Sequence, residues 1–145
     1  MLANKSQKIA KMVESYAGQA HDPHYVGYFD LFNRGLFYEA HDVLENLWLP
    51  RRKEPDGDFY KGLIQLAGAF VHLQKDRLRP AAALFKLADA NLQKYGAAHE
   101  ALALPPIHQL IETYLTLLVS NDYETNPLKT LGPPRLRLEN GIQTL

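Results

Sequence analysis

Hydrophobic residues recur at helical spacing along most of the chain. Residues three and four apart stack on one face of a helix, and Ile9, Met12, Val13 and Tyr16 follow this spacing between residues 6 and 20. The same pattern, interrupted by proline and glycine, predicts further helices over residues 25–33, 37–49, 58–74, 78–95 and 105–120. We therefore expect an all-α fold, a compact bundle of five or six helices.

The segment from Asp58 to Gln74 is predicted to be the central helix. It reads DFYKGLIQLAGAFVHLQ, has no proline and is apolar around most of its circumference, which is typical of a helix surrounded by others. One polar stripe is centred on Gln65, and the residues within about 60° of it include three polar and three small ones: Asp58, Lys61, Gly62, Gly68, Ala69 and His72. The small residues would let another helix approach closely, so we expect His72 to be largely buried.

The preceding segment, FNRGLFYEAHDVLENLW, places His41 and Glu45 one helical turn apart. They share an arc of about 100° with Phe37, Leu44 and Trp48, a face that otherwise reads as core. A buried carboxylate is costly unless it is paired. We therefore expect an interior polar cluster in which His41, Glu45, Gln65 and His72 meet across a close helix pair.

Two kinds of chemistry fit this cluster. Imidazole nitrogen and carboxylate oxygen suit zinc, iron or manganese, so His41, Glu45 and His72 are candidate ligands of a divalent metal such as zinc or manganese. Candidates for the surrounding polar or ligand-binding residues are Gln65, Trp48, Asp58 and Lys61. A hydrogen-bonded network without metal explains the same residues, and Trp48 at helical spacing is more often a core residue.

Two blocks of the sequence resemble a known family. FNRGLFYEAHDVLENLW from Phe32 to Trp48 and GLIQLAGAFVH from Gly62 to His72 are similar to the domain-of-unknown-function 309 family, over roughly residues 28 to 95. The resemblance implies an α-helical bundle and the label of predicted metal-dependent hydrolase. Gln74, Lys75 and Asp76 stand where the family usually has a Gly-Asn turn, which indicates a differently shaped turn.

A weak internal repeat suggests a second hypothesis. The pattern around Gly35, Phe37 and Ala40 returns around Asp76, Leu78 and Ala81, about 41 residues later. Tetratricopeptide-like helical hairpins are arranged in this way and often present grooves to peptides. The alternative to a hydrolase is therefore a non-enzymatic module that binds a peptide or small molecule and whose polar cluster is structural.

Composition limits the remaining choices. With 145 residues, 46% of them hydrophobic, we expect one bundle domain over residues 1–120 and an extended, proline-containing tail over 121–145. The apolar residues of this tail still allow it to pack: Leu128, Leu131, Leu136 and Leu138. Sixteen basic and sixteen acidic residues cancel, which argues against nucleic acid or an anionic membrane as partner, and leaves a small molecule, a peptide or a second copy.

The absence of cysteine excludes disulfides and thiolate metal sites. The sequence also has no apolar run of membrane-spanning length and no signal-peptide core at its start. We therefore expect a cytoplasmic protein.

Overall fold

The computed structural model describes residues 5–139, which are mostly helical. Seven α-helices lie in this range: α1 (Lys5–Val13), α2 (Pro23–Asn33), α3 (Phe37–Trp48), α4 (Gly57–Gln74), α5 (Leu78–Leu92), α6 (Pro105–Ser120) and α7 (Pro127–Leu131). The expected number of five or six is too low because α7 was not predicted. The fold is mostly helical, as expected, and a two-stranded antiparallel hairpin, β1 (Ala98–His99) and β2 (Leu102–Ala103), joins α5 to α6.

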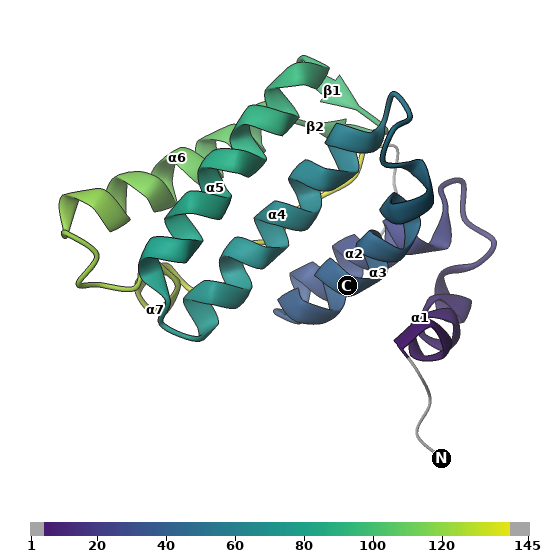
Figure 1. Cartoon of the computed structure of the whole chain (residues 1–145), viewed down its shortest axis with the longest axis horizontal. Coiled ribbons are helices and arrows are strands. Elements are labelled where there is room, and N and C mark those ends of the chain that lie inside the picture. Colours follow the sequence, from purple (N-terminus) through teal and green to yellow (C-terminus); the bar gives the residue numbers. More distant parts are fainter. Residues whose placement is uncertain (1–4, 140–145) are drawn as a thin grey trace.

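Helix α4 is central, as predicted. Figure 1 shows α4 between α3 and α5, with α6 beyond α5. The ring of Phe70 on α4 contacts rings from four other helices: Phe32 of α2, Phe37 of α3, Phe85 of α5 and Tyr114 of α6, at centroid distances between 5.0 and 5.5 Å. Edge-to-face and offset ring pairs at such distances are favourable. This aromatic cluster fixes α4 in the middle of the core.

The first helix is shorter than the predicted span to Ala20. It ends at Val13 and continues as a 3-10 turn over Glu14–Tyr16. The side chain of Tyr16 leaves the helical path to lie against Gly27 of α2, where a Cβ atom would come within 2.9 Å of the ring, and its hydroxyl donates to Asp30 at 2.6 Å. The contact of Tyr16 with α2 therefore ends the helix, although the helical spacing of hydrophobic residues continues to residue 20.

The turns α2–α3 and α4–α5 share one backbone pattern. Gly35 and Asp76 both have positive φ, 75° and 55°. The bonds from Leu36 N to Leu31 O and from Arg77 N to His72 O are equivalent at the repeat offset. The sequence repeat thus corresponds to a repeated helix-ending turn. The tetratricopeptide-like assignment of the hairpins themselves stays a prediction.

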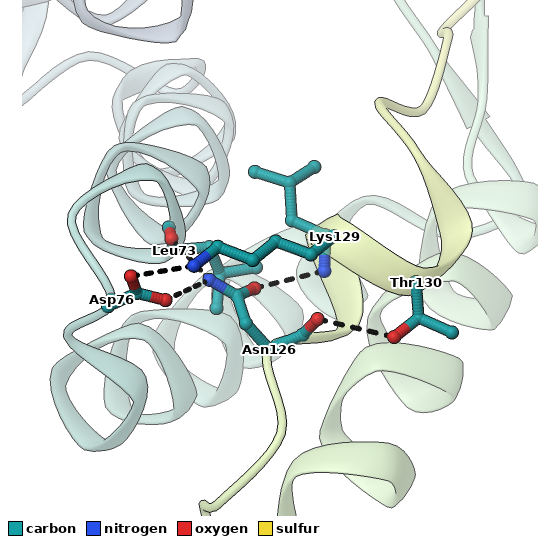
Figure 2. Close-up of polar contacts among 6 residues, drawn as sticks. Leu73, Asp76, Asn126, Lys129 and Thr130 are labelled. Carbon is teal, nitrogen blue, oxygen red and sulfur yellow. Dashed lines mark hydrogen bonds and ion pairs between the residues drawn. The ribbon is translucent and has the colours of Figure 1, made fainter.

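After α6 the chain crosses back to the α4–α5 turn. Figure 2 shows Asn126, just before α7, reaching this turn. Its Nδ2 donates to the carbonyl of Leu73 at 2.6 Å and to Asp76 Oδ1 at 2.9 Å, while its Oδ1 accepts from the amide of Leu128. Lys129 adds an ion pair to Asp76 at 2.8 Å. One buried side chain therefore caps α7 and anchors it to α4.

The expected extended tail packs, as its leucines allow, over the part that the structure describes, whereas its residues 140–145 lie outside the described part. Asn33 brackets Leu136 with two side-chain hydrogen bonds, and Leu136 and Leu138 are buried. Leu138 forms a β-bridge with Leu102 of the hairpin. Among residues 5–139, no helix combines the length and the apolar character that crossing a membrane requires.

Candidate metal centre

Of the two predicted ligands on α3, only Glu45 contacts the first helix. His41 is partly exposed, and its Nδ1 lies 3.1 Å from Oδ1 of the adjacent Asp42. Glu45 forms an ion pair with Lys5 of α1 at 3.3 Å, and Lys5 also pairs with Asp42 at 3.3 Å. The carboxylate of Glu45 thus meets an ammonium group rather than a histidine.

Two of the predicted residues on α4, Gln65 and Asp58, pair with residues outside the predicted cluster. Gln65 Oε1 accepts from Asn91 Nδ2 of α5 at 2.8 Å, and Asp58 pairs with Lys94 at 2.8 Å. Lys61 is exposed. His72 is half-buried rather than largely buried as expected, but its Nδ1 is buried without a hydrogen-bond partner. Trp48 at the end of α3 packs partly buried against the core, with its Nε1 likewise without a partner.

These contacts do not join His41, Glu45, Gln65 and His72 into one cluster. The ring of His41 does approach α4, since its Cδ2 lies 3.8 Å from the position of a Cβ on Gly68. Within residues 5–139, however, His41, Glu45 and His72 are not a group whose ligand atoms lie within 4.8 Å of one another. Metal binding by these three stays a prediction.

One group in the described part of the chain does meet that distance: Asp56, His99 and Glu100. It is built where the β1–β2 hairpin approaches the start of α4. The two residues of the hairpin turn, Glu100 and Ala101, have φ of 47° and 59°, as a two-residue turn matching the strand twist requires. Neither is a glycine, and this backbone conformation is costly for a residue with a Cβ. The strained turn places His99 and the Glu100 carboxylate beside Asp56.

Asp56 and His99 form the centre of the group. Asp56 stands at the N-cap position of α4, but its carboxylate does not cap the helix. It accepts instead a 2.7 Å hydrogen bond from His99 Nε2. The imidazole is held on its other sides by the rings of Phe59 and Tyr95, each 4.7 Å away. Asp56 therefore does not cap the helix, as an aspartate in this position usually does. It bonds instead to His99, 43 residues later in the chain.

Glu100 is held by its backbone while its carboxylate stays accessible. The hydroxyl of Tyr25 donates to the Glu100 carbonyl at 2.8 Å, and Glu100 Oε2 lies 3.8 Å from His21 Nδ1. A second imidazole therefore borders the group.

The charge of this site is less compensated than that of the predicted cluster. Among residues 5–139, the ion-pair partners of Asp56 and Glu100 are His99 and His21, with no lysine or arginine. Burial raises the pKa of the nearby Tyr60 phenol to about 12, and the negative charges of Glu100 and Asp56 contribute to the rise. The positive charge of Arg51 acts against this rise. Two carboxylates that form no ion pair with a lysine or arginine among the described residues attract a cation.

The donor set fits a divalent transition metal. Imidazole and carboxylate ligands bind zinc at about 2.0–2.2 Å, which in tetrahedral geometry places two ligand atoms roughly 3.3–3.6 Å apart. His99 Nε2 and Asp56 Oδ1 lie closer than that, because they share a proton. An ion would replace this proton and require the two side chains to separate by under about 1 Å, which surface side chains can do.

Sequence reasoning gave these residues no role. Asp56 and His99 are too far apart in the chain for a spacing motif, and His21 and His99 looked like isolated histidines near turns. The feature that marks Asp56, an aspartate at a helix start without a capping bond, is visible in the structure and not in the sequence.

A comparison with family models confirms the family resemblance of the two sequence blocks. The family model described as Domain of unknown function (DUF309) matches residues 25–84. No curated protein and no solved structure matches the chain. Asp56 lies inside the matched region, whereas the hairpin with His99 and Glu100 follows it. Residues 25–84 are therefore a DUF309 domain, and this chain carries a domain of that family, whose function is unknown.

Proposed function

We propose that this protein is a metal-dependent hydrolase whose divalent ion, zinc or manganese, is held by Asp56, His99 and Glu100. The observation that carries the proposal is the convergence of one imidazole and two carboxylates, with ligand atoms within 4.8 Å, from two separate parts of the chain. This ligand set replaces His41, Glu45 and His72. Glu45 is less suited because Lys5 already neutralises it.

The chain's own residues have defined tasks in this proposal. Phe59 and Tyr95 hold the His99 ring in place, and Tyr25 fixes the backbone of Glu100. His21, beside Glu100, is a candidate proton carrier or fourth ligand. A bound ion supplies a nucleophile by lowering the pKa of its water. Within its sequence the protein has no cysteine that could serve instead.

The first test is metal binding. We expect zinc or manganese at a hundred times its dissociation constant to stabilise the native state by about 2.7 kcal/mol, which raises the melting temperature by roughly 5–10 °C. His99→Ala should abolish this shift. His108→Ala is a matched control, because His108 forms a similar half-exposed pair with Asp89 (side chains 27% and 30% exposed, against 28% and 36% for His99 and Asp56).

The second test is hydrolysis of chromogenic phosphate and carboxylate esters by the metal-loaded protein. Activity that disappears in His99→Ala and Glu100→Gln but persists in His108→Ala supports the proposal. If the metal shift survives His99→Ala and is lost in His41→Ala, the ligand set first derived from the sequence is the correct one. No shift with either metal would remove the physical basis for a hydrolase.

A further inference from the structure

A second site lies beside β2, at residues that the metal group does not use. A pocket of about 450 Å³ is enclosed by β2, the first turns of α6 and the extended segment 135–139. The Leu102–Leu138 bridge and a 2.7 Å bond from the Glu139 amide to the Ala101 carbonyl hold that segment against the hairpin, and Asn33 holds it at Leu136. The pocket is thus formed by regular backbone pairing, and its volume lies in the range of small-molecule sites.

The wall of the pocket is apolar. It is made by leucine, isoleucine, alanine and proline side chains: Leu102, Ala103, Pro106, Ile107, Leu110 and Leu138. Ile107, Leu102 and Leu138 belong to the core, whereas Ala103 and Leu110 are partly accessible and Pro106 is exposed. Part of an apolar surface is therefore open to solvent, and an apolar chain placed there would displace water.

The rim of the pocket carries a net positive charge. Arg135 and Arg137 line it and are exposed, and within residues 5–139 neither has an ion pair or hydrogen bond. Alternate residues of an extended segment point to the same side, about 6.6 Å apart. Glu139 is the third residue of this series, so the rim has a net positive charge of one. Guanidinium groups recognise carboxylates by paired, charge-assisted hydrogen bonds.

We propose that this pocket binds a medium-chain fatty acid, with its alkyl chain along Ile107 and Leu110 and its carboxylate at Arg135 and Arg137. An apolar wall beside two free arginines complements a ligand with one apolar chain and one anionic end. A neutral alkane matches only the wall, and inorganic phosphate matches only the rim. The proposal is independent of the metal site, because the two sites share no residue.

The test uses decanoate, octanoate and 1-decanol with the full chain in a chelating buffer, followed by calorimetry. Each added methylene should tighten binding about fourfold, so decanoate should bind more than tenfold better than octanoate. Arg135→Gln with Arg137→Gln should weaken decanoate about tenfold or more and leave 1-decanol unchanged. Arg77→Gln, on the α4–α5 turn, is the matched control and should change neither ligand.

A second variant tests the wall. Ala103→Phe should fill the pocket and weaken both decanoate and 1-decanol, with circular dichroism confirming that the fold is retained. Three results would overturn the proposal: no saturable decanoate binding, equal decanoate affinity in the double arginine variant and the original protein, or a dimer in sedimentation that decanoate does not dissociate. The last would assign the surface to a second copy of the chain.

Discussion

At the scale of single residues, the two glycines on the inner stripe of α4 differ in what surrounds them. A Cβ on Gly62 would lie 2.8 Å from Cγ of the buried Leu92 side chain and 3.3 Å from the backbone carbonyl of Ala88, both in α5. A Cβ on Gly68 would meet Leu84 Cδ1 at 3.1 Å, the end of a side chain that can rotate. The sequence pattern treated the two positions as equivalent, and the structure does not.

This difference gives a paired prediction. Gly62→Ala should destabilise the protein by about 1–3 kcal/mol through overpacking. Gly68→Ala should be neutral or stabilising by up to about 1 kcal/mol, because alanine favours the helix. Urea denaturation of the two variants measures both values. Equal destabilisation at both sites would contradict this account of the α4–α5 contact.

His72 is a residue whose burial has a pH consequence. Burial lowers the pKa of this imidazole below its ordinary value, and the charges of Arg77 and Lys75 lower it further. The folded state therefore resists protonation more than the unfolded state does. The resulting stability is present above about pH 6.5 and is lost as the pH falls through the lowered pKa of the folded state.

We therefore expect His72→Gln to make stability less dependent on pH. Between pH 7.5 and 5.5, the free energy of unfolding of the original protein should fall more than that of the variant, as measured by urea denaturation at each pH. The other five histidines are present in both proteins and cancel in the comparison. An equally steep fall in both proteins would show that His72 is not held in its neutral form.

At the scale of elements, α7 depends on one buried amide. A five-residue helix has almost no stability of its own, and Asn126 supplies both its cap and its bond to α4. Asn126→Ala should destabilise the protein by about 2–3 kcal/mol, since it removes a cap and leaves the buried Leu73 carbonyl without this donor.

The neighbouring ion pair provides the control. Lys129→Ala removes the ion pair with Asp76, in which the lysine side chain is 67% and the aspartate side chain 56% exposed. Because solvent screens such exposed pairs, this change should destabilise the protein much less than Asn126→Ala does. Hydrogen exchange of the amides in α7 would measure both variants. If Lys129→Ala opens α7 as much as Asn126→Ala does, the exposed ion pair rather than the buried amide holds this helix.

At the scale of the whole molecule, the core is rich in tyrosine. Burial raises the pKa of Tyr16 to about 12 and that of Tyr60 to about 12, and also raises the pKa of Tyr25, Tyr28, Tyr95 and Tyr114. The hydroxyl of Tyr28, for example, is fully buried and donates to the Leu63 carbonyl at 2.6 Å. Ionising a fully buried phenol such as that of Tyr28 therefore requires the core to open.

The alkaline titration of the protein should show this coupling. A raised phenol pKa gives stability that is fully present below the unfolded value of about 10 and is lost as the pH rises through the folded value. At pH 11, absorbance of phenolate at 295 nm should be much lower in the native protein than in guanidinium chloride, and should rise together with the loss of helical dichroism. If the phenolate titration curve of the native protein coincides with that of the denatured protein, the phenols are not buried.

The sequence alone determined six of the seven described helices, the central place of α4 and the family resemblance of residues 25–84. Hydrophobic periodicity, prolines and glycines act within a few residues, so they define each helix and its apolar face wherever it packs. The two blocks around His41 and Gln65 carried the family for the same reason, since each is a continuous run. Even the repeated turn at Gly35 and Asp76 was visible as a repeat.

Only the tertiary structure decided which polar groups meet. Glu45 bonds Lys5 from 40 residues away, and Asp56 bonds His99 from 43, and no local pattern encodes such pairs. The hairpin carries Glu100 and Ala101 where glycine or asparagine is usual, so its turn gave no signal. Helical phase indicates the direction of a side chain, but the packing of separate helices determines its partner, and the candidate metal centre and the arginine-rimmed pocket both depend on such packing.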